Sequence, residues 1–471
     1  MSDADEARII DEAFRILSDI GLSEVPDVLG EEAVRQGAHW SDIGRLCFPR
    51  KVVEGLIAGA AKTCTYYGRS PELDVCIGGD RVYYGTGGAA VQTLDIDSGR
   101  YRESTLVDLY DFTRLIDTLD NVNYFTRCCV ATDMPDNWLL DINTVYALLQ
   151  GTKKPVGTSF TIAEHVDSIV DMLEAVALDE GFTWAERPFV YAHISPVISP
   201  LRFGDDAVQV ALKCIERGVP INNIIAAQSG ATAPATPAGF LAASLAETIA
   251  SLIMVNLFKP GHPMVFSNWP LVIDLRTGAF AGGGGEVAVM NAAAAQLANA
   301  LGLPSGVASS MTDSKAVDAQ MGSEKAMTAL AVGLAGANSV YESSGMMASL
   351  LGASFEAFVA DNEMLSHIHR VLRGIEVTEE TLGFDTILAA VTGEGHFLGT
   401  DQTMQSMERD YYYPALADRD EPRTWMLGGS VDLATKAKAR AREVLANHLP
   451  KLLSEAMDKV WREKFDIRLE L

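Results

Sequence analysis

The sequence predicts an α/β protein whose centre is a closed parallel barrel, with helical extensions at both ends of the chain. From about residue 80 onward, a short β-branched run, a turn and a helical segment recur eight times over roughly 290 residues. Such alternation requires a parallel sheet, and eight units are typical of a (β/α)8, or TIM, barrel. An open doubly wound sheet is the second candidate, but no GxGxxG motif follows the first strand.

The elements follow in order along the chain. "ARIIDEAFRILSDIG" and "RKVVEGLIAGAAK" space their apolar residues as helices do, and predict an N-terminal helical extension over residues 1–80. Residues 81–373 are predicted to form the barrel, with strands in "RVYYG", "NVNYFTRCC", "KPVGTSF", "PFVYAHIS", "PINNIIAA", "PMVFSNW", "PSGVASS" and "ANSVYESS". Beyond Gly374 the repetition stops, so residues 374–471 are predicted to be a C-terminal helical extension, able to cap one end of the barrel.

Composition narrows the class of protein. The 471 residues are 48% hydrophobic and 21% charged, which indicates a folded chain, and the net charge of −26 disfavours nucleic acid and anionic membranes as partners. No uninterrupted apolar run reaches the ~18 residues of a membrane span, and the acidic start "MSDADEARIIDEAF" is unlike a signal peptide. Six scattered cysteines without a CxxC pair predict reduced thiols in a cytoplasmic protein.

Side chains that reach the mouth of the barrel are expected to carry the function, because TIM-barrel sites lie at the C-terminal ends of the strands. In "PFVYAHIS" the apolar alternate residues suit the helix-facing side, so the other set, Tyr191 and His193 among it, points inward. Barrel filling and a structural histidine remain the alternatives for these two residues. The same logic on the other strands yields Tyr83 or Tyr84, Phe160, Trp269, and either Tyr341 or Glu342.

Glu342 stands out among these candidates because a carboxylate inside a barrel needs a cation or a hydrogen-bond donor. Lys315, in "MTDSKAVDAQ", is one candidate partner, and a cationic substrate is another. The chain has no HExxH, paired CxxC or GxSxG motif, so neither a zinc site nor a serine hydrolase is predicted. The mouth is therefore expected to be rich in aromatic rings, to hold few titrating groups, and to bind no metal.

Long motifs after the later strands resemble the trimethylamine methyltransferase (MttB) superfamily. They are "QSGATAPATPAGFLA", "DLRTGAFAGGGGEVAVMNAAAAQLANALGLPSG", "TDSKAVDAQMGSEKAM", "GANSVYESSGMM…SFEAFVADNEM" and "GEGHFLGTDQT…YYYPALADR…W", and the resemblance runs from about residue 80 to the end. It implies a TIM barrel that transfers a methyl group from a methylamine to the cobalt of a separate corrinoid protein.

The loop after the eighth strand separates the branches of this superfamily. Trimethylamine-specific members carry pyrrolysine in or close to it, whereas this sequence has only standard residues there, Met346 and Met347 among them. The chain is therefore similar to the members without pyrrolysine, such as glycine betaine methyltransferase and relatives that act on proline betaine or carnitine.

The chemistry implied by the resemblance suits a mouth of this kind. A quaternary ammonium leaves as a neutral tertiary amine and needs no proton donor, so the protein has to position and desolvate its substrate. Aromatic faces contribute about 0.5–2 kcal/mol each to binding a cation, and methionine side chains are flexible, polarisable lining. Glu342 is the candidate counter-charge of the ammonium. His193, Gln228, Lys315 and His396 are the candidate donors to a substrate carboxylate.

The resulting hypothesis is a cytoplasmic, homo-oligomeric methyltransferase that moves a methyl group from a quaternary amine, glycine betaine first, to the cobalt(I) of a partner corrinoid protein. No residue of the chain is assigned as catalytic, because the nucleophile is the cobalt of the partner. Two alternatives stay open: a TIM-barrel lyase or aldolase that uses Lys315 as a Schiff-base amine, and a non-catalytic protein that binds quaternary amines.

Overall fold

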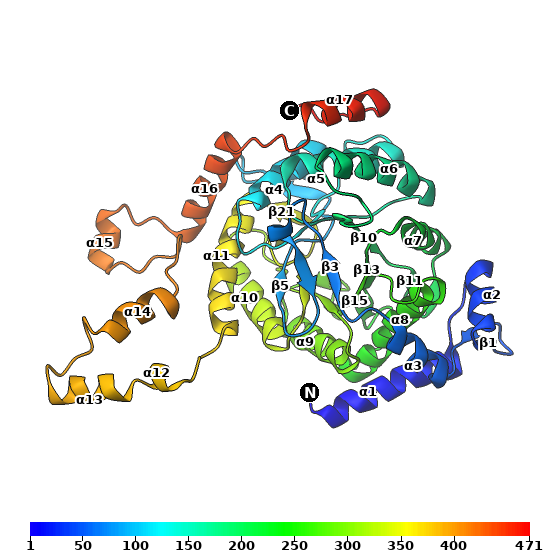
Figure 1. The fold of residues 1–471 in the computed structure, drawn as a ribbon, viewed down its shortest axis with the longest axis horizontal. Helices are drawn as coiled ribbons and strands as arrows, with labels where there is room; N and C mark the ends of the chain where they lie inside the picture. The colour runs from blue at the N-terminus through cyan, green and yellow to red at the C-terminus, as the bar shows by residue number, and fades with distance from the viewer.

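The computed structural model describes all 471 residues and has a closed eight-stranded parallel barrel at its centre (Figure 1). A bridge between Gly85 and Tyr124 joins the first two barrel strands along the chain and closes the sheet. All eight predicted strands are confirmed, and they pair in chain order: β5 (Tyr83–Tyr84), β8 (Phe125–Thr126), β9 (Val156–Thr158), β10 (Val190–Ile194), β13 (Ile221–Ile225), β15 (Met264–Asn268), β18 (Ser305–Ala308) and β19 (Ser339–Tyr341). The predicted fold class is thus confirmed as a TIM barrel.

One helix follows each barrel strand and covers the outside of the barrel (Figure 1). These helices are α4 (Leu106–Asp117), α5 (Asn137–Gly151), α6 (Ala163–Asp179), α7 (Asp205–Arg217), α8 (Pro237–Phe258), α9 (Gly285–Ala300), α10 (Ala319–Leu334) and α11 (Phe355–Leu372). Helix α4 begins at a capping box in which Thr105 and Asp108 bind each other's backbone amides, a local signal that fixes its first turn.

Helix α8 corrects one expectation from the sequence. By length and composition it would pass for a membrane span, although polar residues interrupt its apolar ones before any run reaches ~18 residues. In the structure 83% of its apolar window is buried, and it packs against α1, α2 and α3 on one side and strands of the barrel on the other. The apolar composition of α8 is therefore that of a core helix, covered on all sides.

The N-terminal region contains more than the predicted helices. Helices α1 (Asp3–Arg15), α2 (Asp27–Arg35) and α3 (Arg50–Gly59) lie on the outside of the barrel, with a π-helical turn at Ile16–Ile20 and a short hairpin of β1 (His39–Trp40) and β2 (Leu46–Cys47). A second hairpin, β3 (Cys64–Tyr66) with β4 (Val75–Ile77), lies at the N-terminal end of the barrel, near its axis in Figure 1. The hairpin closes the N-terminal end of the barrel.

The βα loops at the opposite, C-terminal end form a two-stranded pair, β11 (Val197–Ile198) with β12 (Arg202–Phe203), and two larger sheets. One joins β14 (Gln228–Ser229), β16 (Leu271–Ile273) and β17 (Phe280–Ala281). The other joins β20 (Met346–Met347), β21 (Gly352–Ser354), β6 (Gln92–Leu94) and β7 (Tyr101–Glu103). The loop with the two methionines is therefore a buried strand pair that belongs to the second sheet, and it ties the first and eighth βα loops together.

The C-terminal region divides into an arm and two packed helices. Residues 374–430, with α12 (Glu379–Leu382), α13 (Phe384–Thr392), α14 (Asp401–Arg409) and α15 (Pro422–Leu427), project sideways from the barrel and cap neither end (Figure 1). Helix α16 (Leu433–Asn447) returns to pack on α11 and α4, and α17 (Glu455–Lys464) contacts α6.

The interior of the barrel supplies a test of the fold. The ring of Tyr66 from β3 stacks on Tyr191 with centroids 3.7 Å apart, and its hydroxyl lies 2.7 Å from that of Tyr341. We expect Tyr66→Ala to lower the free energy of unfolding by about 3–5 kcal/mol, because it empties a packed interior site. Tyr66→Phe removes only the hydroxyl and should cost about 0.5–1.5 kcal/mol. Urea denaturation checks both values, and equal losses in the two variants would contradict the proposed packing role.

Candidate functional site

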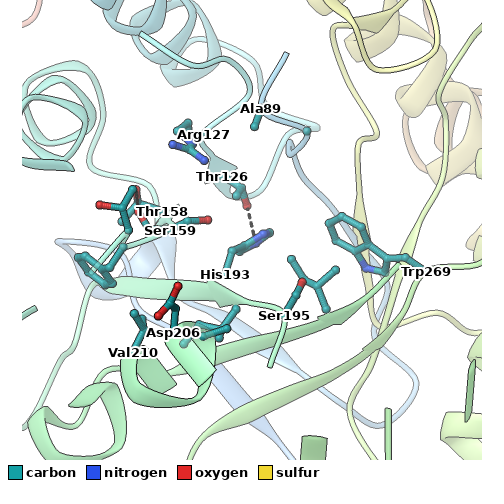
Figure 2. Close-up of a pocket in the computed structure, with 16 residues that line it drawn as sticks. Ala89, Thr126, Arg127, Thr158, Ser159, His193, Ser195, Asp206, Val210 and Trp269 are labelled. Carbon is teal, nitrogen blue, oxygen red and sulfur yellow. Dashed lines mark hydrogen bonds between the residues drawn. The ribbon is translucent and has the colours of Figure 1, made fainter. Parts of the chain in front are cut away.

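A cavity of about 380 Å³ opens at the C-terminal ends of the first six barrel strands. Figure 2 shows its labelled lining residues, which come from the loop after β5, the ends of β8, β9, β10 and β15, and the first two turns of α7. Asp206, on the first of these turns, is exposed, so the cavity reaches the surface of the molecule. Position and size suit a small-molecule site in a TIM barrel.

Hydroxyl-bearing, aliphatic and aromatic residues share the wall of this cavity. The residues that line it are Gly88, Ala89, Thr126, Arg127, Thr158, Ser159, Phe160, Thr161, His193, Ile194, Ser195, Asp206, Ala207, Val210, Ile224 and Trp269. Only Arg127, His193 and Asp206 among them carry titrating groups. The side chains can bind and orient a ligand, but they offer little acid–base chemistry.

His193 is held in a neutral form with a defined orientation. Its Nε2 accepts a hydrogen bond from the amide nitrogen of Asn222 at 2.9 Å, and the amide oxygen of Asn222 accepts one from Ser267. Burial, together with the positive charge of Arg127, lowers the pKa of His193 to about 3. Because Nε2 is occupied as an acceptor, Nδ1 carries the proton, and His193 acts as a hydrogen-bond donor at neutral pH.

A layer of tyrosines forms the floor below the cavity. Tyr66, Tyr124, Tyr191 and Tyr341 pack edge to face or stacked in the barrel interior, and all four are buried. The ring of Tyr341 lies 5.3 Å from Trp269 and 5.2 Å from His193. Tyr341 therefore supports from below the rings of Trp269 and His193, which line the cavity.

Glu342 is the most unusual group near the mouth. It directly follows β19, it is 0% exposed, and neither carboxylate oxygen has a hydrogen-bond partner. Its backbone has a φ of 65°, in the left-handed region, which L-residues adopt at a cost of about 1–3 kcal/mol and which is concentrated at functional sites. Burial raises the pKa of Glu342 to about 8, although the charge of Lys325 opposes this shift.

The carboxyl group of Glu342 is separated from the cavity by a glycine. A side chain at Gly88, which lines the cavity, would come within 2.9 Å of a Glu342 oxygen and 2.6 Å of the Met346 methyl group. The φ of Gly88 is +114°, so this close approach of the backbone requires glycine. Glu342 and Met346 thus lie directly behind the wall of the cavity.

Only some of the site residues predicted from the sequence line the cavity. Phe160, His193 and Trp269 line the cavity. Tyr191 and Tyr341 belong to the tyrosine floor. Glu342, Met346 and Met347 are buried but do not line the cavity. Tyr83 packs against the tyrosine layer from the start of β5, away from the mouth.

Four predicted site residues are placed elsewhere and are corrected here. Tyr84 points outward, where its hydroxyl donates to the carbonyl of Ala329 on α10. Gln228 lies on the outer sheet and does not line the cavity. The exposed ammonium of Lys315 donates to the carbonyl oxygen of Asp313, so it neither reaches Glu342 nor occupies the dry site that a Schiff-base amine needs.

His396 is the fourth. It lies between α13 and α14 on the projecting arm, where it is exposed and pairs with Glu394 at 3.4 Å. Its position in the arm excludes it from the cavity within one chain (Figure 1).

Three charged residues near the mouth were not predicted from the sequence. Arg127 lines the cavity, although "NVNYFTRCC" reads as a strand interior. Lys325 of α10 and Asp361 of α11 form a buried ion pair at 2.9 Å with side chains 0% and 1% exposed, and Asp361 also accepts the backbone N–H of Gly345. The sequence does contain a signal for this pair, because each of the two helices carries one charged residue on its otherwise apolar face.

Known proteins are similar to this chain over most of its length. The family model for trimethylamine methyltransferase (MTTB) matches residues 1–468, which extends the predicted resemblance through the N-terminal region. A glycine betaine methyltransferase of Desulfitobacterium hafniense is 29% identical over 455 residues, 96% of this chain and 93% of the relative. A trimethylamine methyltransferase MttB of Methanosarcina barkeri is 32% identical over 373 residues, 79% of this chain and 74% of the relative.

A solved structure matches the fold. The monomethylamine methyltransferase MtmB of Methanosarcina barkeri superimposes with a TM-score of 0.50 at 13% sequence identity, over 95% of this chain and 94% of that one. At that identity the match supports the barrel architecture alone.

The buried carboxyl of Glu342 yields a prediction on stability. Between pH 4.5 and about 8 the folded protein keeps the proton of Glu342 while the unfolded chain has lost it, so native stability falls as the pH rises. Glu342→Gln does not titrate, and we expect it to gain stability over the native protein by about 1.4 kcal/mol per pH unit across this window. Urea denaturation at about pH 5, 6.5 and 8.5 measures the difference. A difference that does not change with pH would contradict the raised pKa.

Proposed function

The chain belongs to the trimethylamine methyltransferase family, and we propose that it moves a methyl group from a quaternary amine, glycine betaine or a related betaine, to the cobalt of a partner corrinoid protein. The observation that carries this proposal is the cavity at the barrel mouth, which has ring faces and hydroxyls but few acids or bases. Such a wall suits a reaction in which the protein holds a permanent cation and transfers no proton.

The partner's cofactor supplies the chemistry: reduced cobalt in a corrinoid is a strong nucleophile toward a methyl carbon on a positive nitrogen. The residues of this chain bind and orient the amine, and they exclude water from around it. Trp269 and Phe160 offer their ring faces to methyl groups on the ammonium, and the neutral imidazole of His193 adds no competing positive charge. The amine leaves with the electron pair of the broken C–N bond and is neutral, so no proton donor is required.

Glu342 contributes a negative charge from behind Gly88. In the absence of a cation its carboxyl group is held protonated by burial, and a quaternary ammonium in the cavity favours its ionised form. We propose that Glu342 responds to the substrate in this way as an electrostatic group, without contact with the reacting carbon. Met346 packs behind the same glycine and gives the wall a polarisable, chemically inert backing.

The cellular setting follows from the same proposal. Six free cysteines, five of them buried, suit a reducing compartment, so we place the protein in the cytoplasm. A partner corrinoid protein is expected to approach the C-terminal face of the barrel, where the cavity opens. We expect the chain to work as a homo-oligomer.

Turnover can be measured directly. The protein is incubated with cob(I)alamin and, in separate reactions, glycine betaine, proline betaine, carnitine, choline and trimethylamine, and the methylcobalamin spectrum is followed. We expect methyl transfer from at least one betaine and none from trimethylamine, because the chain lacks pyrrolysine. Binding of a betaine without any methylation, with cob(I)alamin or with a corrinoid protein encoded beside this chain, would indicate the non-catalytic binding protein instead.

Trp269 provides a mutational test of the cation site. We expect Trp269→Ala to lower kcat/KM for the betaine about 3- to 30-fold, the equivalent of one cation–π contact of about 0.5–2 kcal/mol. Trp269→Phe keeps a ring face and should lose less. Trp184→Phe, at the N-terminal end of the barrel beside Phe189, is the matched control and should leave kcat/KM unchanged. Equal activity of Trp269→Ala and the native protein would exclude Trp269 from the substrate site.

A further inference from the structure

We propose that Arg127 binds the carboxylate of the substrate and thereby restricts the cavity to zwitterionic quaternary amines. This inference rests on the proposed function, and it assigns to one residue the choice between a betaine and an amine without an acid group, such as choline. None of the four donors predicted from the sequence includes Arg127, and only His193 among those four lines the cavity.

The first argument is that the Arg127 guanidinium has no partner within the chain. It forms no side-chain hydrogen bond and no ion pair, although it is half-buried and lines the cavity (Figure 2). Other buried arginines are satisfied: Arg69 pairs with Glu180 at 2.9 Å, and Arg114 pairs with Asp111 at 2.7 Å. A guanidinium has five donors in a fixed fork, so leaving all of them unpaired near the interior is costly unless a ligand or water binds them.

The second argument concerns Asp141, the carboxylate whose charge acts most strongly on Arg127. Its Oδ2 accepts from Thr161, both backbone and hydroxyl, and lies 2.8 Å from His165 Nδ1. Its Oδ1 is unpaired but is beyond ion-pair distance from Arg127. Burial lowers the pKa of Arg127, and the charge of Asp141 only partly offsets this effect. Asp141 therefore holds the wall of the site and leaves the charge of Arg127 free for an anion.

The third argument is the arrangement of the cavity. Figure 2 shows His193 between Arg127 and Trp269, so the cationic side chain and the largest ring face lie on different sides of the imidazole. The hydroxyl of Ser159 lines the same cavity and can add a hydrogen bond to a carboxylate. A small zwitterion can thus place its carboxylate at Arg127 and its ammonium at Trp269.

The same side chain disfavours the wrong ligand. A plain cation such as choline leaves Arg127 unpaired and meets its positive charge in a partly dry cavity, where charges interact more strongly than in water. A zwitterion satisfies Arg127 with a bidentate, charge-assisted pair. Discrimination therefore has an attractive and a repulsive part, and both depend on Arg127.

Equilibrium binding by calorimetry tests the inference without turnover. We measure the affinities of glycine betaine and choline for the native protein, Arg127→Gln and Arg127→Lys. In the native protein we expect betaine to bind at least tenfold more tightly than choline. Arg127→Gln should weaken betaine binding about ten- to a hundredfold, the loss of a charged hydrogen-bonded contact, and leave choline unchanged or tighter. The betaine affinity of Arg127→Lys should lie between those of the native protein and Arg127→Gln. Lysine keeps the positive charge but cannot form the bidentate pair of a guanidinium.

The control is Arg276→Gln, an exposed arginine paired with Asp274 outside the cavity, which should change neither affinity. Equal weakening of both ligands in Arg127→Gln, unchanged betaine affinity, or native protein that binds choline as tightly as betaine would each overturn the inference. If Arg127→Gln fails to fold, the betaine-to-choline ratio of Arg127→Lys decides, and an unchanged ratio overturns the inference. Betaine binding that depends on Arg127, without methylation of a corrinoid, would contradict the proposed function alone.

Discussion

The stacking of Tyr66 on Tyr191 inside the barrel is the interaction on which the site depends. A closed eight-stranded barrel has an interior that side chains must fill, and here the N-terminal hairpin contributes one of the largest of them from below. The hydroxyl contact between Tyr66 and Tyr341 then fixes the upper layer. Because Tyr341 supports both Trp269 and His193, the position of the hairpin sets the depth of the cavity above it.

Above this floor the site is defined by the different surroundings of its titrating groups. Lys325 and Asp361 neutralise each other in the interior, and His193 is kept neutral by burial and by its neighbour. Arg127 and Glu342 are left without partners, one in the wall of the cavity and one behind it. A buried carboxyl group without a partner is costly, and the proposed zwitterionic ligand would bring charges that complement both groups.

The fold was predictable from the sequence because alternation of strands and helices leaves a strong period in residue type. The hairpin of β3 and β4 was missed, since strands of three residues are too short to show a period. Side-chain alternation separates inward from outward residues on a long strand such as β10. It does not tell how far along the barrel axis an inward side chain lies. Tyr191 therefore seemed a candidate for the mouth, whereas it lies in the floor.

The site was harder to predict than the fold. On β5, which has two residues, alternation could not choose between Tyr83 and Tyr84. Arg127 was overlooked because its surroundings read as a strand, and only the three-dimensional structure shows that its guanidinium has no partner. Lys315 and His396 were chosen for their chemistry, but their loops carry them to the surface.

The hairpin also constrains how the chain can assemble during synthesis. Tyr66 leaves the ribosome before any barrel strand exists, yet its hydroxyl partner Tyr341 follows 275 residues later. Contacts this distant in sequence form slowly, because a long loop must close before they contribute. The base of the barrel is therefore completed only after the eighth strand has emerged, and until then the apolar faces of the nascent chain have to be shielded from one another.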